Sequence, residues 1–581
     1  MHKFLLTALA VGLASAGLSC GASAAQTFEG TATGKHGDIT VAVTFDNNKI
    51  ADIRIVKEEE NPVLTQKVYK DLREAIIAGN SVAVDSISGA TLSSDALKAA
   101  VKAAADKAGV TLAATPLIVT KREVKIPEKD GYDVIVIGAG GAGFAAAVSA
   151  HDSGAKVVML EKMPTLGGNS LISGAEYAAA NNWVQQKLGI KDSVEQHFQD
   201  TMKGGDMLGD PAVVRVLVEN ALPTALWLRD TIGVEFQEDN LFHFGGHSVK
   251  RSLIPKGATG AEFINKFVKA TAERKIPIFT ETRVTELIRD KDGRVTGVKA
   301  EIDGKIHQVN AKKGVVIATG GFSANVALRA KLNPFYGEGF KTTNLPCAQG
   351  DGIFMAEKVG AASVNMEQIQ TYPMCDPISG AIELIDDARF EGAILINQEG
   401  KRFVEELERR DVMSKAILEQ TGQYCYALFN QAVEDRAHAI EHHQDEVRVF
   451  SKTGILKTGK TLDEVAAAFD IPADALKATV ARVNEFAKTG KDLDFGYRGK
   501  FSDLSEGPYW IYRGVPSVHH TMGGLKINPK AQVLDKNDKP IPGLWAAGEV
   551  TGCTHGSNRL GSNAYTDIMV FGRIAGSEAA K

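Results

Sequence analysis

The chain has 581 residues, of which 44% are hydrophobic and 24% are charged, a composition typical of folded globular proteins and not of disordered or fibrous ones. Its 66 basic and 71 acidic residues give a formal net charge of −5, which argues against a nucleic-acid-binding protein. At about 150 residues per domain the length predicts three or four domains, and the 58 glycines favour the tight turns and close backbone approaches that nucleotide cofactors need.

The first 25 residues have the layout of a secretory signal peptide. Lys3 is followed by an apolar run over 4–18 and by the small-residue sequence Ala-Ser-Ala at 22–24. The run is shorter than the ~20 residues of a membrane-spanning helix, and the residues before Cys20 match a lipoprotein acylation site poorly. We therefore expect residues 1–25 to be a cleaved signal peptide and the mature protein to be periplasmic.

The cysteines are far apart in the sequence: Cys20, Cys347, Cys375, Cys425 and Cys553. No CxxC or CxxCH sequence occurs, so neither a zinc knuckle nor an attached c-type haem is indicated and no metal site is expected. Electrons must then travel by another carrier. Removal of the signal peptide leaves four scattered thiols. The sequence does not decide whether two of them form a disulfide in an oxidising compartment.

Residues 26–110 predict a small α+β module. Two β-rich runs, at 41–45 and 50–56, flank a turn of Asp and Asn residues, which is the pattern of a hairpin. Helical patterns follow near 64–79 and 94–109. A hydroxyl-rich turn precedes the second of these helices and suits its N-terminal cap.

That turn also has a more specific interpretation. Its sequence, DSISGATLSS over 85–94, resembles the flavinylation motif D..SGAT.S/T of FMN-binding domains, in which a phosphoester joins FMN to the Ser or Thr that ends the motif, here Ser93. The resemblance implies an FMN-binding domain over 26–110, covalent FMN on Ser93 and a flavin transferase that attaches it. Backbone N–H groups and the dipole at a helix N-terminus favour a phosphate there. A plain helix cap is the alternative.

A dinucleotide-binding unit is predicted after a charged, proline-containing linker over 111–130. An apolar run over 132–137 is followed by the sequence GAGGAG, an alanine-rich helical stretch, a second apolar run that ends at Leu160, and Glu161. In this order the glycines open a helix onto a pyrophosphate, and the acidic residue binds ribose hydroxyls. The pattern alone leaves NAD and FAD open.

Short motifs mark the rest of the sequence: KMPTLGGNS at 162–170, ATGGF at 318–322, GDG at 350–352, AAGE at 546–549 and HGSNRLG at 555–561. Together they resemble the soluble fumarate reductase and succinate dehydrogenase flavoprotein family. The resemblance covers about 130–581 and implies non-covalently bound FAD. The FAD-binding residues that it implies are Gly138, Ala139, Gly140, Gly143, Glu161, Lys162, Gly168, Asn169, Ser170, Gly174, Ala318, Thr319, Gly320, Asp351, Gly548, Glu549, Ser562 and Asn563.

The resemblance also implies a domain organisation. Residues 131–369 and 516–581 are expected to form a Rossmann-like FAD-binding domain, and residues 370–515 an inserted, mobile clamp domain that closes over the isoalloxazine ring. Such a clamp excludes water during hydride transfer. With the small FMN-binding α+β domain, the expected fold class is multidomain α/β and α+β.

The segment from Lys401 to Asp411 is similar to the family segment whose arginine protonates the substrate carbon. The match implies that Arg410 is the catalytic acid, although a single arginine more often forms a surface ion pair. Because the ordinary pKa of arginine is above 12, such an acid needs a relay that protonates it again. The ionisable neighbours expected in this relay are Asp386, Asp387 and Arg389, and we assign Asp387 a catalytic role as well.

The sequence HHTMGG at 519–524, together with Arg559, matches the positions that hold a substrate carboxylate in the family. The match implies that His519 and Arg559 bind the substrate. A histidine and an arginine offer charge-assisted hydrogen bonds, and the arginine fork holds two oxygens. We expect one end of the substrate to be a carboxylate, and His520 to be a packed core residue.

The opposite end of the pocket departs from the fumarate-reducing pattern. Glu176 and Phe244 stand where methionines are usual, and Tyr372 stands where a histidine is usual. Asp386 and Asp387 fall near a threonine–glutamate pair, and the alignment leaves open which of them faces the substrate. Added carboxylates and aromatic rings would repel a second carboxylate and suit a flat, partly cationic ring.

Urocanate, an imidazole joined to an acrylate, fits both ends of such a pocket. Its carboxylate is expected at His519 and Arg559, its ring nitrogens at Glu176 and Asp387, and its ring near Phe244 and Tyr372. This combination of residues resembles the urocanate-reducing members of the family.

The expected reaction reduces the acrylate double bond of urocanate to give dihydrourocanate (imidazole propionate). The resemblance implies a hydride from N5 of reduced FAD and a proton from Arg410, in a terminal reductase of anaerobic respiration. Electrons are expected to come from a membrane-associated, quinol-oxidising cytochrome and to pass through FMN to FAD. Reduction of fumarate, methacrylate or an aryl acrylate is one alternative, and a non-catalytic flavinylated electron-transfer protein is another. No nucleic-acid partner is expected.

Overall fold

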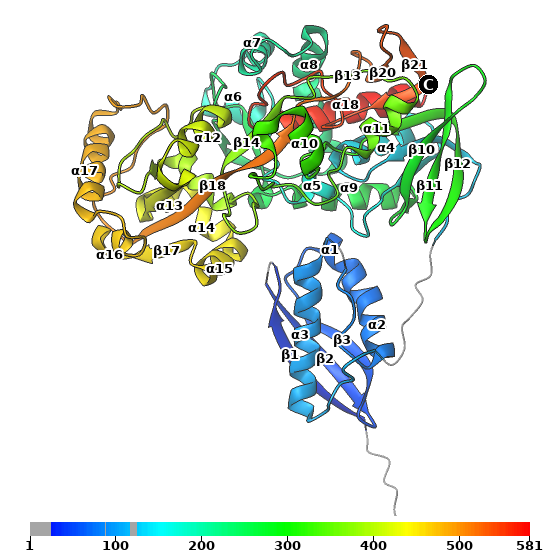
Figure 1. The fold of residues 1–581 in the computed structure, drawn as a ribbon, viewed down its shortest axis with the longest axis horizontal. Coiled ribbons are helices and arrows are strands. Elements are labelled where there is room, and N and C mark those ends of the chain that lie inside the picture. The colour runs from blue at the N-terminus through cyan, green and yellow to red at the C-terminus, as the bar shows by residue number, and fades with distance from the viewer. Residues whose placement is uncertain (1–24, 36, 88, 117–124) are drawn as a thin grey trace, which may run out of the picture. The chain divides into compact units, whose positions relative to one another are not determined.

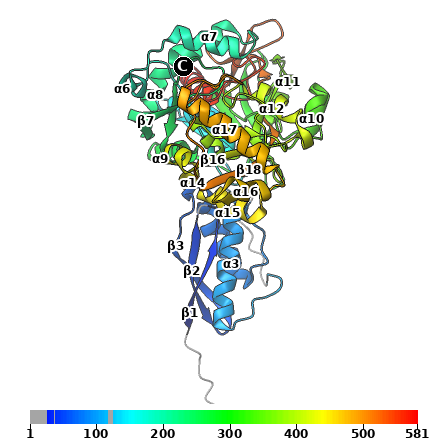
Figure 2. The ribbon, with the colours of Figure 1, turned by 90° about the vertical axis from the view of Figure 1, so that its left-hand side faces the viewer.

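The computed structural model describes residues 25–35, 37–87, 89–116 and 125–581. The predicted signal peptide, with Cys20, falls on residues 1–24 and lies outside the described residues, apart from Ala25. The protein forms two compact units (Figures 1 and 2), the first mainly from residues up to 121 and the second mainly from residues 122–581.

The N-terminal unit is an antiparallel sheet packed against helices. Its elements are β1 (Gln26–Thr33), β2 (Asp38–Asp46), β3 (Lys49–Lys57), α2 (Arg73–Gly79) and α3 (Thr91–Ala108), with strand order β1-β2-β3. The short helix α1 (Pro62–Lys67) belongs to the second unit. The predicted hairpin and the helix near 94–109 are confirmed. The helix near 64–79 is interrupted by a π-helical turn over Val68–Leu72. β1 was not predicted because most of its side chains are polar and exposed, so it lacks an apolar alternation.

The main sheet of the second unit has the order expected for dinucleotide binding. β4 (Tyr132–Ile137), α4 (Gly141–Asp152) and β5 (Val157–Leu160) form the predicted strand–helix–strand unit, and the two strands are parallel. The sheet runs β10-β11-β12-β4-β5-β9, and β21 joins it beside β12. These other strands are β9 (Ile278–Phe279), β10 (Arg283–Arg289), β11 (Val295–Ile302), β12 (Lys305–Ile317) and β21 (Pro540–Ala546).

The C-terminal helix α18 (Asn563–Ala579) packs closely along α4. A Cβ atom at Gly572 or Gly576 would lie 2.6 or 2.1 Å from the carbonyl oxygens of Ala142 and Ala146. Only glycine therefore lets the two backbones approach this closely. The contact places the C-terminal segment next to the glycine-rich turn that precedes α4.

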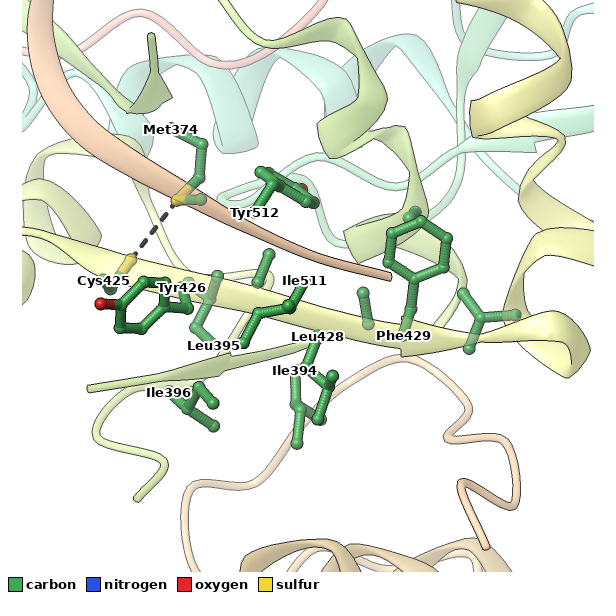
Figure 3. Packing of buried hydrophobic residues seen from close by; sticks show 14 of the residues in the cluster. Met374, Ile394, Leu395, Ile396, Cys425, Tyr426, Leu428, Phe429, Ile511 and Tyr512 are labelled. Carbon is green, nitrogen blue, oxygen red and sulfur yellow. Dashed lines mark hydrogen bonds between the residues drawn. The ribbon is translucent and has the colours of Figure 1, made fainter. Parts of the chain in front are cut away.

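A second sheet lies in the region predicted as the clamp. Its strands are β14 (Ile369–Cys375), β18 (Tyr509–Thr521), β16 (Cys425–Asn430) and β15 (Ile394–Ile396) in this order, and β17 (Leu456–Gly459) also pairs with β18. Figure 3 shows its packed apolar side chains, among them Cys425 and Met374. The sulfur atoms of these two residues lie 3.4 Å apart. The 13-residue strand β18 runs through the boundary predicted at 515/516, so it joins the two predicted domains without a break.

The remaining elements include two further small sheets, of order β6-β8-β7 and β13-β19. Those before β14 are α5 (Gly168–Leu171), β6 (Tyr177–Ala178), α6 (Trp183–Leu188), α7 (Val194–Gly204), α8 (Pro211–Trp227), β7 (Phe236–Phe242), β8 (Ser252–Pro255), α9 (Ala261–Glu273), α10 (Val326–Leu332), α11 (Asp351–Lys358) and β13 (Ser363–Val364). Those after it are α12 (Arg410–Leu418), α13 (Gln431–Ala437), α14 (Ala439–His442), α15 (Gln444–Thr453), α16 (Leu462–Ala467), α17 (Ala473–Thr489), β19 (Gly524–Leu525) and β20 (Gln532–Leu534).

The cysteines of the described part are free thiols: Cys347, Cys375, Cys425 and Cys553. The disulfide that the sequence left open is therefore not formed among them. Across the described ranges, no helix combines the length and the apolar character needed to cross a membrane.

Candidate active site

A cavity opens at the glycine-rich turn between β4 and α4. Gly140, Gly141 and Ala142 line it, so the N-terminus of α4 points its backbone N–H groups and positive dipole end at the cavity. Most of the predicted FAD-binding residues also line it: Gly138, Gly140, Glu161, Lys162, Gly168, Asn169, Ser170, Ala318, Thr319, Gly320, Asp351 and Glu549.

The shape of this turn requires glycine. Gly138 has a φ of +101°, and a Cβ there would lie 2.4 Å from the carbonyl oxygen of Ala318. A Cβ at Gly143 would lie 2.0 Å from the carbonyl oxygen of Gly138, whereas one at Gly140 would meet no atom closer than 3.8 Å. The backbone at Gly140 is thus open on the cavity side. This cradle fits the pyrophosphate of FAD.

Charged residues line the part of the cavity beyond β5. The Glu161 carboxylate accepts hydrogen bonds from the backbone N–H groups of Ala139 and Met163, both at 2.8 Å, and burial raises its pKa. Lys162 Nζ lies 2.7 Å from Asp351 Oδ2. Each carboxylate keeps further lone pairs that can accept from ribose hydroxyls.

The other predicted FAD-binding residues do not line the cavity. Asn563 Oδ1 lies 3.0 Å from Nε2 of His197, and Ser562 Oγ lies 2.6 Å from Ser252 Oγ. The residues placed outside the lining are Ala139, Gly143, Gly174, Gly548, Ser562 and Asn563.

Two arginines form the cationic end of the candidate substrate site. Arg410 is the first residue of α12, and Arg559 lies in the loop before α18 with 5% of its surface exposed. Within the described ranges neither guanidinium group has a hydrogen bond or an ion pair, and Arg410 Nη1 and Arg559 Nε are buried. Burial lowers the pKa of both residues. A buried cation without a partner is unfavourable, so this arrangement indicates an anionic ligand.

His519 lies at the same end of the site, on β18. Its Nδ1 is 2.8 Å from Thr343 Oγ1, which fixes the orientation of the ring. Burial, together with the charges of Arg559 and Arg410, holds the pKa of His519 well below its ordinary value. The ring is therefore neutral. His520 is buried beside the ring of His555, with ring centres 5.3 Å apart, as expected for a core residue.

Aromatic rings hold the side chain of Arg410. Its guanidinium carbon lies 4.7 Å from the ring centre of Tyr372 and 5.6 Å from that of Phe244. Phe244 in turn packs edge to face against Phe390, with ring centres 4.7 Å apart. These cation–π contacts place the guanidinium without neutralising it.

The structure separates the two candidate aspartates. Asp386 is fully buried and accepts hydrogen bonds from the hydroxyls of Tyr372 and Tyr512, both at 3.1 Å, and from Arg389 Nη2 at 2.7 Å. Burial raises the pKa of Asp386 in spite of these contacts. Asp386 thus lies behind Tyr372, and Asp387 is the one that interacts with Glu176.

Glu176 and Asp387 form the acidic end of the site. Burial and the negative charge of Asp387 raise the pKa of Glu176 to about 7. The Glu176 side chain folds over Gly174, where a Cβ would lie 2.4 Å from Oε1. The positive charges of Arg410 and Arg559 act on Glu176 in the opposite sense. Two cations and two acidic groups therefore share the site, and such a site selects ligands with a complementary charge distribution.

The Glu176→Gln variant is expected to lose the part of the pH dependence of the unfolding free energy that comes from titration of Glu176. The pKa of about 7 in the folded protein exceeds the ordinary value of about 4.3, so the folded state binds this proton more tightly than the unfolded state does. The wild type therefore loses stability relative to the variant as pH rises from about 4.5 to 7, and the difference is constant above pH 7. Thermal unfolding of both proteins between pH 5 and 8.5 measures it. A difference in Tm that does not change with pH would show that Glu176 does not titrate in this range.

Sequence reasoning missed several residues that position the site. Thr343 and His443 lie in no recognisable sequence motif. His443 Nε2 lies 3.4 Å from Asp387 Oδ2.

Asp206, in the turn between α7 and α8, accepts hydrogen bonds from Arg409 Nη1 at 2.8 Å and from Ser557 Oγ at 2.5 Å. These last three residues, called the Asp206 bridge below, connect the start of α12 to the loop that carries Arg559.

Comparison with known protein families identifies two regions. Residues 133–564 match the FAD binding domain family, and residues 34–106 match the FMN-binding domain family. The first match covers most of the sequence and includes every residue of the candidate substrate site.

Individual relatives are similar over most of the sequence. The urocanate reductase of Eggerthella lenta is 43% identical over 96% of this chain and 92% of its own length. The cytochrome-type fumarate reductase of Shewanella frigidimarina is 40% identical over 78% of this chain and 77% of its own length. A solved open conformation of a flavocytochrome c3 fumarate reductase superposes with a TM-score of 0.63, at 36% identity, over 77% of this chain and 78% of that one.

Proposed function

Because the chain belongs to the fumarate reductase flavoprotein family and carries both an FAD-binding and an FMN-binding domain, we propose that it is an exported urocanate reductase. It is an FAD-dependent oxidoreductase. The proposed reaction is the reduction of the acrylate double bond of urocanate, which gives dihydrourocanate (imidazole propionate). Relatives that reduce urocanate and fumarate support reduction of an unsaturated acid as the general activity.

One observation carries the choice of substrate. The guanidinium groups of Arg410 and Arg559 have no hydrogen-bond or ion-pair partner within the described part of the protein, and Glu176 and Asp387 bring two acidic groups into the same site. Fumarate has a carboxylate at both ends, and its second carboxylate would be repelled by this acidic pair. Urocanate has a carboxylate at one end and a ring with an N–H donor at the other.

Binding of the substrate carboxylate prepares the double bond for reduction. Arg559 and neutral His519 would hold the two oxygens through charge-assisted hydrogen bonds and stabilise the negative charge that develops towards them in the transition state. At the opposite end, Glu176 and Asp387 would accept hydrogen bonds from the ring, whose flat faces suit Phe244 and Tyr372. Bound FAD, in its reduced form, supplies the hydride.

Arg410 would give the proton to the other alkene carbon. Burial and the neighbouring cation Arg389 lower its pKa, although Tyr372 and Glu176 act in the opposite direction. After transfer, a proton must return to its guanidinium. Tyr372, Asp386 and Arg389 form a continuous hydrogen-bonded series beside Arg410 and are the proposed relay.

The N-terminal module would receive the electrons. We assign covalent FMN to Ser93, the third residue of α3, where the N-terminus of this helix favours the phosphate. A flavin transferase would attach it, and a membrane-associated, quinol-oxidising cytochrome would be the electron donor in the periplasm. The proposed role is that of a terminal reductase in anaerobic respiration.

Ser93→Ala is expected to abolish covalent FMN and to leave FAD bound. The phosphoester requires the hydroxyl of this residue, and FAD is held by a different domain. Flavin fluorescence of the denatured protein and its intact mass measure the loss after expression with the transferase. Ser94→Ala is the matched control and should keep its FMN. Covalent FMN on the Ser93→Ala protein would assign the attachment to another residue.

Glu176→Met combined with Asp387→Ala is expected to lower kcat/KM for urocanate by about 100-fold or more, because two hydrogen bonds to charged acceptors are lost. FAD content should not change, since neither residue lines the FAD cavity. Steady-state assays with a reduced dye and the absorbance spectrum measure the two quantities. Turnover within threefold of the wild type would remove both carboxylates from the ring-binding role.

The direct test of the proposed function is anaerobic reoxidation of the reduced protein with both flavins bound. Urocanate and fumarate are added to separate samples after reduction by a viologen dye, and flavin absorbance is followed. Fast reoxidation by urocanate alone is expected. Reoxidation by fumarate alone would identify the protein as a fumarate reductase, and reoxidation by neither compound nor by methacrylate or aryl acrylates would favour an electron carrier.

A further inference from the structure

Asp387 is held in place by one contact. His443 Nε2 lies 3.4 Å from Asp387 Oδ2, and the described residues provide no other hydrogen bond to this carboxylate. Asp387 has 12% of its side chain exposed, and His443 has 2%. One Asp387 oxygen therefore faces a buried imidazole, and the other is left for a ligand.

The position of His443 is fixed by the backbone around it. It connects α14 and α15, donating its N–H to the carbonyl of Ala439 (3.3 Å) and accepting from the N–H of Val447 (3.0 Å). In the first turn of α15, Glu446 Oε2 accepts a hydrogen bond from the backbone N–H of Ile385 (3.1 Å). The start of α15, with its N-cap residue His443, thus contacts the short helical segment Leu384–Glu391 at two points, one of which is Asp387.

The charges around His443 favour this pairing. Burial lowers the pKa of His443, but the hydrogen bond and the charge of Asp387 outweigh it, helped by Glu446 and Asp445, and the pKa is raised. The ring of His442 is 6.3 Å away and is exposed. His443 therefore acts as a donor to Asp387.

We infer that His443 is a positioning residue that turns Asp387 towards the ring of the substrate and thereby sets the preference for an imidazole. With Oδ2 engaged by His443, Oδ1 offers an acceptor to a ring N–H. A phenyl ring or a second carboxylate has no N–H to give and gains nothing from this oxygen. The inference rests on the proposed function, because it assumes an imidazole at the acidic end.

Two variants of His443 test the inference. His443→Phe keeps a flat ring but removes the donor, so KM for urocanate should rise about 10- to 100-fold, with kcat within about threefold and FAD content unchanged. His443→Gln places an amide donor near Nε2 and should restore KM to within about fivefold of the wild type. His442→Phe, at the exposed neighbouring position, is the matched control and should not differ from the wild type.

A double-mutant cycle with Asp387→Ala separates positioning from general packing. If His443 acts through Asp387, His443→Phe should change KM by less than twofold in the Asp387→Ala background. An equal KM effect in both backgrounds, or a KM for His443→Phe equal to that of the wild type, would overturn the inference. Failure of the wild type itself to be reoxidised by urocanate would instead contradict the proposed function, so the two failures are distinguishable.

Discussion

Arg410→Ala is expected to lower kcat for urocanate reduction by about 10³- to 10⁴-fold, close to the upper range for loss of a general acid. The Arg410 guanidinium is held between the rings of Tyr372 and Phe244 and has no partner of its own in the described ranges. No neighbouring group is placed to substitute for it, because Arg389 is bound to Asp386. Both flavins should stay bound.

Rapid mixing of the reduced Arg410→Ala protein with urocanate measures the chemical step directly. FAD reoxidation should become slower than the wild type by the same factor as kcat, since the proton and the hydride are needed in one reduction. Arg410→Lys keeps a protonated group of lower ordinary pKa and should recover part of the rate. Activity of the alanine variant within tenfold of the wild type would overturn the assignment of Arg410 as the acid.

Arg559→Met is expected to change function and stability in opposite directions. Loss of the carboxylate ligand should lower kcat/KM by about 10²- to 10³-fold. The apolar replacement also removes a buried cation that lacks a hydrogen-bond partner in the described part of the protein, and such a replacement stabilises a protein. We therefore expect Tm of the substrate-free protein to rise.

Arg329→Met is the matched control for the kcat/KM and Tm measurements on Arg559→Met. Arg329 is also fully buried, but its guanidinium donates to the carbonyl oxygens of Tyr336 (3.0 Å) and Phe340 (3.2 Å). Its replacement should lower Tm, because two acceptors lose their donor, and should leave kcat/KM unchanged. A fall in Tm for Arg559→Met as large as that for Arg329→Met would show that Arg559 has a structural partner.

The elements that the sequence predicted well are those whose signals are local. The apolar run at 132–137 and the glycines after it dictate β4 and the start of α4, because tight turns and buried parallel strands leave few alternatives. The hairpin of β2 and β3 has the same local character. β1 was not predicted because its side chains are mostly exposed, and only its pairing with β2 makes it a strand.

The sequence predicted which residues belong to the candidate site, but it did not predict how they are arranged. Family motifs identified Arg410, His519 and Arg559, but the adjacent residues Asp386 and Asp387 could not be told apart. The two residues differ because the segment Leu384–Glu391 buries Asp386 completely against Arg389, whereas Asp387 keeps 12% of its side chain exposed. His443 lies 56 positions further along the sequence, and no local pattern links it to an aspartate.

The Asp206 bridge has a consequence for the order of events in a catalytic cycle. Arg409, which makes the bridge, and Arg410 are consecutive residues at the start of α12. Any movement that separates α12 from the turn between α7 and α8 must break the bridge and shift Arg410, the proposed proton donor, with it. In the proposed reaction, such an opening for substrate exchange would also withdraw the acid. Protonation would then take place only while the bridge is formed, so this contact would time the reaction.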